Sequence, residues 1–173
     1  TIPNPPNPGA QFQIYSDVET YGPLQNQTGI NWAQRLDWRG APVDHNVITL
    51  YSDLGEYPRE GPHQVLLDPQ WMARHFAAIE THVNLKIPDR NWAGMGVIDY
   101  EIWWPQWTRT QSTAQNAWRA YIRANRPELL QFLSANEQEA VFKQTFNDAA
   151  RDFCTATINE CRRLRPNAKW GFF

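Results

Sequence analysis

Apolar residues recur every three or four positions in two long stretches, which is the period of an α-helix with one buried face. The first stretch follows Asp68-Pro69, an N-cap with proline at the first helical position, and is expected to run to Ile87. The second follows the capping-box pattern Ser134-Ala-Asn-Glu137 and is expected to end at Arg165. Shorter helices are predicted for residues 30–38, 110–125 and 127–133.

Strands are predicted where short apolar, β-branched or alternating runs stand between these helices. The runs are residues 11–16, 47–51, 96–101 and 169–173. Strands that alternate with helices are typical of a parallel α/β sheet, and four of them are expected here. Residues 1–10 contain four prolines and read as an extended tail, and residues 52–67 read as a long irregular loop.

The third strand carries the candidate chemistry. Asp99 and Glu101 follow Val97-Ile98 and stand two residues apart, so both project from the same side of a strand, while Ile98 and Tyr100 face the other side. Their Cα atoms are expected about 6 to 7 Å apart, from two steps of about 3.3 Å. If both are shielded from water, one carboxyl can stay protonated and act as a general acid. Most Asp-x-Glu pairs nevertheless lie on solvated surfaces, and only the apolar run before the pair and the tryptophans after it favour a site.

Composition excludes several classes of protein. The 173 residues carry a net charge of −2, so no global basic field is available for nucleic acid or for an acidic polysaccharide, and any polyanion must be held by local groups. No apolar run is long enough to span a membrane, and the chain does not begin with a charged-then-apolar leader, so a secretory signal, if there was one, is expected to have been removed. His75 and His82 lie without a third ligand nearby and are interpreted as packing or surface residues. Cys154 and Cys161, seven apart on one predicted helix, are too distant for a mutual disulfide.

The run Gly96-Val-Ile-Asp-Tyr-Glu101, followed by Trp103-x-Pro105-x-Trp107, resembles the catalytic strand of the hyaluronidase family of glycoside hydrolases. Three other segments resemble that family in the same order along the chain. They are Phe12–Tyr15 for the first strand, Leu54–Pro58 for the loop after the second, and Arg165–Phe172 for the fourth.

The resemblance implies a TIM-like α/β barrel, of which residues 11–173 would be the N-terminal half, with the remainder of the barrel on the same chain or another. It implies cleavage of β-1,4 N-acetylhexosaminide links in hyaluronan, or in chondroitin, without metal or cofactor. Glu101 would be the general acid and Asp99 would hold the acetamido group of the substrate. Other residues expected at the sugar site are Asp17, Tyr57, Trp103 and Phe173, of which Asp17 stands for a family Asn and Phe173 for a family Tyr.

Alternatives remain open at this point. Asp17 is equally well explained as a turn residue and Tyr57 as a loop anchor, and Arg162, Arg163 and Arg165 as solvated charges at a helix end. The protein could also be a weak or silent family member that binds glycans or another protein, or an unrelated α/β domain. The resemblance implies a secreted glycoprotein, or a lysosomal one as second choice; Asn26-Gln-Thr28 is a glycosylation sequon, and the early cysteine typical of the family is missing.

Overall fold

The computed structural model describes residues 14–15, 43–44, 46–51, 54–58 and 63–173. The predicted tail 1–10 and helix 30–38 lie outside the described residues, as do Asp17 and the sequon at Asn26. The chain divides into two compact units, residues 1–49 and residues 50–173.

In the first unit, the described part contains two short parallel strands. β1 (Ile14–Tyr15) pairs with β2 (Val43–Asp44), so that Ile14 lies beside Val43 and Tyr15 beside Asp44. β1 falls within the predicted strand 11–16, but β2 was not expected. A two-residue strand has no measurable alternation, which explains why the hydrophobic pattern does not reveal it.

The second unit is built on a small parallel sheet. β4 (Met95–Ile98) pairs with β5 (Lys169–Phe172), with Gly96 beside Trp170 and Ile98 beside Phe172. β3 (Val47–Leu50) adjoins β4 to give the order β3-β4-β5. Its last residue, Leu50, belongs to this unit and accepts a hydrogen bond from the Asp99 N–H at 2.9 Å. The expected strands at 47–51, 96–101 and 169–173 are therefore present, in shorter form.

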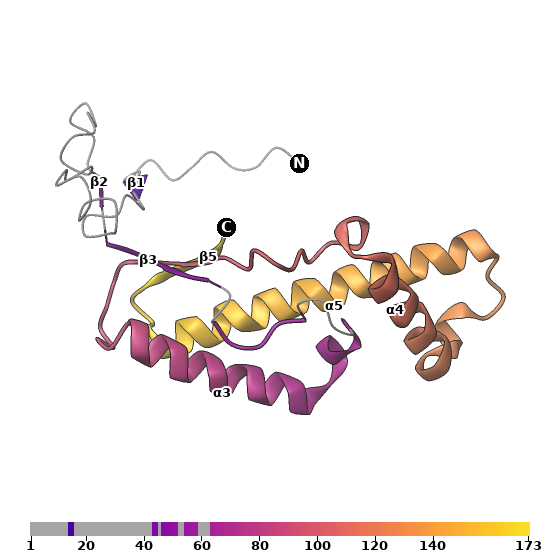
Figure 1. Cartoon of the computed structure of the whole chain (residues 1–173), viewed down its shortest axis with the longest axis horizontal. Helices are drawn as coiled ribbons and strands as arrows, with labels where there is room; N and C mark the ends of the chain where they lie inside the picture. The colour runs from indigo at the N-terminus through magenta and orange to yellow at the C-terminus, as the bar shows by residue number, and fades with distance from the viewer. Residues whose placement is uncertain (1–13, 16–42, 45, 52–53, 59–62) are drawn as a thin grey trace. The chain divides into compact units, whose positions relative to one another are not determined.

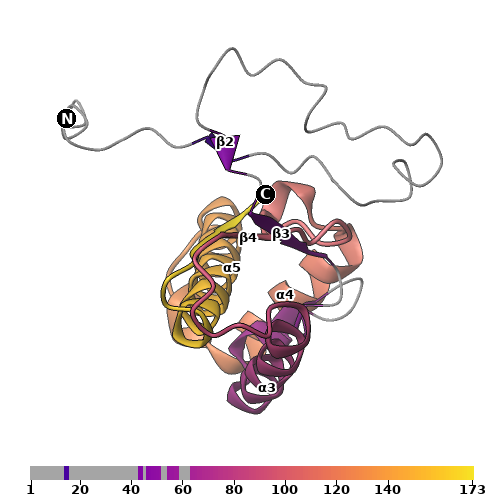
Figure 2. The ribbon, with the colours of Figure 1, turned by 90° about the vertical axis from the view of Figure 1, so that its left-hand side faces the viewer.

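Two long helices support this sheet. α3 (Pro69–Lys86) begins at Asp68, whose carboxylate accepts from the Gln70 N–H, and α5 (Ala135–Leu164) begins with the predicted capping box at Ser134. They pack against each other, and in both views they lie on the same side of β4 and β5 (Figures 1 and 2). The buried stripe of α5 keeps the helical period; its residues are Phe142, Phe146, Ala149, Ala150, Phe153, Thr157, Cys161 and Leu164.

Shorter elements connect these parts, and some of them differ from the prediction. α4 (Ser112–Asn125) and the 3₁₀ helix η3 (Pro127–Leu130) match the expected helices. Two further 3₁₀ helices are present: η1 (His63–Leu67) lies where loop was expected, and η2 (Trp107–Arg109) lies in a stretch for which no element was predicted. Each is a turn or two long, too short for an amphipathic period to show.

The end of α5 also corrects an expectation. Arg165 was interpreted as a solvated charge, but its side chain is completely buried. Its guanidinium donates to the carbonyls of Ile87 and Leu164 and to Asn84 Oδ1, so it caps the C-terminal end of α3. Buried carbonyl groups need donors, and this arginine supplies them from the other helix.

Candidate active site

The Asp99 and Glu101 pair lies at the C-terminal end of β4. Side chains at the end of this strand alternate as predicted: Ile98 and Tyr100 are buried, Asp99 is half-buried and Glu101 is exposed. The strand itself ends at Ile98, however, so the pair follows the strand rather than lying within it. Glu101 begins a turn, and the chain changes direction there.

Tyr100, between the two carboxylates, is fixed in the protein interior. Its hydroxyl donates to the Leu54 carbonyl at 3.0 Å, and its ring stacks on Tyr57 with centroids 4.2 Å apart and planes at 17°. The edge of its ring also meets Phe172 of β5, with centroids 5.6 Å apart. Burial holds the pKa of Tyr100 well above its ordinary value, so the phenol stays protonated and remains a donor. Asp99 and Glu101 are thus attached to a rigid residue.

A hollow of about 780 Å³ opens beside the pair. We call it the β4 hollow. It is lined by Asp99, Tyr100, Glu101, Trp103, Trp104, Pro105, Gln106, Arg109, Cys154, Phe172 and Phe173. A cavity of this size suits a ligand of several rings, and carboxylates beside aromatic side chains are the groups that a glycosidase presents to a sugar.

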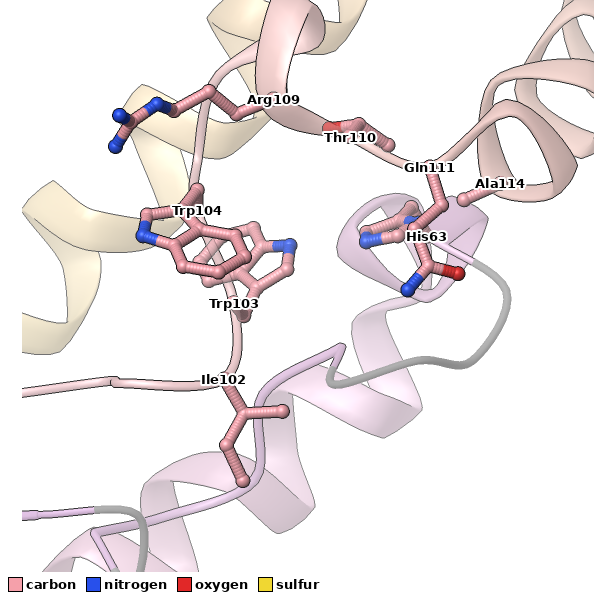
Figure 3. Close-up of a pocket in the computed structure, with 8 residues that line it drawn as sticks. All are labelled: His63, Ile102, Trp103, Trp104, Arg109, Thr110, Gln111 and Ala114. Carbon is pink, nitrogen blue, oxygen red and sulfur yellow. The ribbon is translucent and has the colours of Figure 1, made fainter.

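Trp103 is a buried residue in the wall of this hollow. Its indole is only 3% exposed and stands edge-on to Phe153, with ring centroids 5.4 Å apart. A second cavity of about 30 Å³ separates it from His63, and Figure 3 shows the nitrogen-bearing edge of the indole on the side that faces His63. Within the described part of the chain, Trp103 Nε1 and His63 Nδ1 are both buried without a hydrogen-bond partner. The rings of Trp103 and His63 are stacked at a distance, with centroids 6.3 Å apart and planes at 25°.

Two residues of the β4 hollow were missed by the sequence prediction. Trp104 is 50% exposed, and the guanidinium of Arg109 lies 5.9 Å from the centre of its ring. Figure 3 shows the two side chains near each other at the edge of the small cavity. The turn at Glu101 interrupts the two-residue period, so the strand pattern could not indicate which tryptophan faces outward. The adjacent pair Trp103-Trp104 was the only available signal, because one of two neighbours in an extended chain normally faces solvent.

The remaining predicted site residues, Phe173, Tyr57 and Asp17, do not all lie at the β4 hollow. Phe173 is 97% exposed and lines the β4 hollow; its N–H donates to the Ile98 carbonyl at 3.0 Å, which places it across from Asp99. Tyr57 is 5% exposed and packs in the core against Tyr100, and it does not line the hollow. Asp17 lies outside the described residues.

Other chemistries find little support in the part of the chain that the structure describes. Burial raises the pKa of Cys154 to about 11, so this cysteine of the hollow is a thiol at neutral pH and a poor nucleophile. Cys154 and Cys161 are not joined to each other in the structure. Among the described residues no group of three His, Cys, Asp or Glu side chains converges on a metal-sized site. None of the described helices is both long and apolar enough to cross a bilayer.

Comparison with known proteins identifies the family. The family model described as hyaluronidase matches residues 33–173, which is most of the chain. The chain belongs to the hyaluronidase family. The predicted resemblance of the catalytic strand, residues 96–101, lies within the matched region and is confirmed at the level of the family.

Several hyaluronidases are similar in sequence. Hyaluronidase-4 of Homo sapiens is 30% identical over 182 aligned residues, covering 95% of this chain and 38% of the human protein. Hyaluronidase-1 of Bitis arietans is 28% identical over 135 residues, covering 74% of this chain and 30% of the snake protein. The chain therefore spans only about a third of the length of these two relatives.

Solved structures of the family share the fold. Bee venom hyaluronidase matches with a TM-score of 0.63 at 23% identity, over 94% of this chain and 54% of the bee protein. The same enzyme in complex with a hyaluronic acid tetramer also matches with a TM-score of 0.63, at 20% identity, over 93% of this chain and 53% of that one. The α/β arrangement of the described residues is therefore a hyaluronidase-type arrangement, spanning about half of the bee protein.

Proposed function

We propose that the protein containing this chain is a glycosidase that cleaves β-1,4 N-acetylhexosaminide links in hyaluronan. The observation that carries the proposal is the position of Asp99 and Glu101, side by side at the end of β4 and lining the β4 hollow. Membership of the hyaluronidase family supports the same reaction class. One family member with a solved structure comes from bee venom, which is a secretion. We therefore also propose that this protein is secreted.

The geometry of the pair favours a substrate-assisted mechanism. Two carboxylates that stand two residues apart after one strand cannot readily reach a sugar from opposite faces as an acid and a nucleophile do. The acetamido oxygen of the substrate instead attacks the anomeric carbon while Glu101 gives its proton to the departing glycosidic oxygen. Asp99 orients the acetamido group and stabilises the positive charge of the cyclic oxazolinium. Water then attacks the anomeric carbon, its proton returns to Glu101, and the ring opens to restore the acetamide.

We further propose that the chain forms the first part of an α/β barrel. The helices α3 and α5 lie on one side of the sheet, as the outer helices of a barrel do (Figure 2). On the strands, a Cβ added at Gly171 would meet no atom within 4 Å, so this position adjoins open space. The remainder of the barrel, on the same chain or on another, would fill that space and pair the free strand edges.

The substrate must be held by local charge, because the chain is slightly acidic overall. Among the described residues that line the β4 hollow, Arg109 is the one with a cationic side chain. We propose that Arg109 meets a carboxylate of the polymer while the exposed face of Trp104 packs against a sugar ring. Chondroitin carries the same carboxylate, so both polymers are tested as substrates.

Glu101→Gln tests the proposal. The amide keeps the volume of the side chain but has no proton to give, so hyaluronan cleavage should fall at least about a hundredfold. The thermal midpoint should stay unchanged, because Glu101 is exposed. Glu128→Gln, which changes an exposed glutamate of η3 outside the hollow, is the matched control and should keep full activity. Cleavage is measured with a reducing-end assay. Near-normal turnover by Glu101→Gln would show that Glu101 is not the general acid.

A second function is favoured by one observation. Phe173 lies across from Asp99 and lines the hollow, yet it has no hydroxyl to bond the acetamido group. If the tyrosine that the family resemblance places here is needed, the protein is a weak or silent enzyme that binds glycans. Phe173→Tyr should then raise turnover about tenfold or more, from a hydrogen bond of roughly 1 to 3 kcal/mol, while hyaluronan binding measured by calorimetry changes little. High activity of the wild-type protein would exclude this second function.

A further inference from the structure

The segment Leu54–Pro58 is attached to α3 through two histidines. The Gly55 N–H donates to His82 Nδ1 and the Glu56 N–H donates to His75 Nδ1, each at 3.0 Å. In both contacts the imidazole nitrogen accepts, so each ring is neutral and carries its proton on Nε2. Two successive backbone amides therefore bind to two rings that lie two helical turns apart.

The His75 contact is extended into the core. His75 is completely buried, and its Nε2–H donates to Thr157 Oγ1 of α5 at 2.9 Å. The Thr157 hydroxyl in turn donates to the Phe153 carbonyl at 2.8 Å. The direction of every hydrogen bond in this chain is fixed, because the Glu56 amide at one end can only donate and the Phe153 carbonyl at the other can only accept. The ring cannot turn over without breaking two of these bonds.

Gly55 allows the segment to come this close. Its φ of +67° is a left-handed conformation that other residues rarely adopt. A Cβ at this position would lie 2.6 Å from His75 Nδ1 and 2.9 Å from Ile79, which is closer than side chains approach. The glycine therefore serves the approach of the backbone to the two histidines.

The other side of the segment holds Tyr100. The Leu54 carbonyl accepts from the Tyr100 hydroxyl, and Tyr57 stacks on the Tyr100 ring. The segment thus lies between α3, which binds its amides, and the residue between Asp99 and Glu101. A shift of the segment is expected to reach Tyr100 through this hydrogen bond and this stack, and Asp99 and Glu101 are bonded to Tyr100 along the chain.

We propose that His75 and His82 are positioning residues of the active site: through the segment Leu54–Pro58 they set the place of Tyr100 and, with it, of Glu101. The catalytic part of this inference rests on the proposed glycosidase function. The part that concerns Tyr100 does not, and it is measured separately.

Three variants of His82 in the whole protein provide the test. His82→Asn keeps an acceptor oxygen close to the place of Nδ1, His82→Gln moves the acceptor outward, and His82→Leu removes it. Nuclear magnetic resonance of ¹³C-labelled tyrosine rings, with Tyr100→Phe to assign the signal, reports on Tyr100. Amide hydrogen exchange at Gly55 and Glu56 reports on the segment.

We expect His82→Leu and His82→Gln to shift the Tyr100 signal and to speed exchange at Gly55 at least tenfold, with His82→Asn close to wild type. On hyaluronan, the two disruptive variants should lower kcat about tenfold with little change in KM, because a misplaced acid weakens the transition state and leaves substrate binding intact. If His82→Leu does not fold, the comparison of Asn with Gln gives the same answer.

The outcomes separate the two proposals. An unchanged Tyr100 signal in the Leu and Gln variants would overturn the positioning role, whatever the activity. A shifted signal with unchanged kcat would overturn its catalytic part. A shifted signal in a protein whose wild type cleaves neither hyaluronan nor chondroitin would refute the proposed function, while His82 would still be shown to position Tyr100.

Discussion

Arg165 is expected to be among the most important single residues for the stability of the second unit. It is completely buried, and no carboxylate accepts from its guanidinium among the hydrogen bonds of the described residues. Its acceptors are the carbonyls of Ile87 and Leu164, which stand at the C-terminal ends of α3 and α5, and the amide oxygen of Asn84. The side chain therefore joins the ends of the two helices immediately before β5.

The size of the effect follows from the groups that lose a donor. Arg165→Met preserves much of the side-chain length but leaves the Ile87 and Leu164 carbonyls buried without this donor. Each such group costs about 1 to 3 kcal/mol. Relief from holding a charge away from water offsets part of the loss. We expect a net destabilisation of about 3 kcal/mol, or a fall in Tm of roughly 10 °C for a unit of this size.

Two further variants make the assay specific. Arg162→Met changes an exposed arginine of the same helical turn and should alter the free energy of unfolding by less than about 0.5 kcal/mol. Arg165→Lys keeps the charge but cannot serve several acceptors at fixed angles, so most of the loss should remain. Urea unfolding followed by far-ultraviolet circular dichroism measures all three. Equal stability of Arg165→Met and Arg162→Met would refute the reasoning.

Three other predictions concern packing, protonation and substrate charge. A Cβ at Gly96 would lie 2.3 Å from the Trp170 ring, so Gly96→Ala should cost about 1 to 3 kcal/mol in urea unfolding. Burial lowers the pKa of His75 from 6.5 to about 4, although the charge of Glu160 opposes the shift. The unfolded chain therefore binds a proton first, and the stability present above pH 6.5 should decline by up to about 3 kcal/mol as the pH falls to 4, a decline that His75→Gln should lack. Arg109→Gln should raise KM for hyaluronan several-fold and weaken its dependence on salt, in steady-state kinetics at low and high ionic strength.

Sequence reasoning was reliable where a signal is local. The Asp68-Pro69 cap and the capping box at Ser134 each predicted a helix start to within a residue, because their hydrogen bonds join neighbours in the sequence. The alternation at the end of β4 placed Asp99 and Glu101 on the side opposite Tyr100 for the same reason. Such signals need no knowledge of the rest of the fold.

The features that escaped prediction depend on distant partners. His75 is buried, in agreement with its interpretation as a packing residue, but the hydrogen bonds that His75 and His82 accept were not predicted, because the donating amides lie 19 and 27 positions away. Arg165 was placed in solvent because its acceptor at Ile87 is 78 positions away. A polar residue at a helix end is solvated or buried according to what packs there, and the helical period does not contain that information.

The strand that carries the proposed catalytic pair shows why such distant contacts matter for the proposed chemistry. Asp99 and Glu101 have few attachments of their own: one is half-buried, the other exposed, and the chain turns immediately afterwards. A rigid acid is nevertheless required, since a displacement of about 1 Å can cost about a hundredfold in rate. Tyr100 can supply this rigidity, because its ring and hydroxyl are held in the core and its backbone is bonded to both Asp99 and Glu101. Where a strand leaves a sheet, a residue packed in the core can thus hold its more exposed neighbours in place, and under the proposed mechanism the packing of Tyr100 therefore affects the position of the acid.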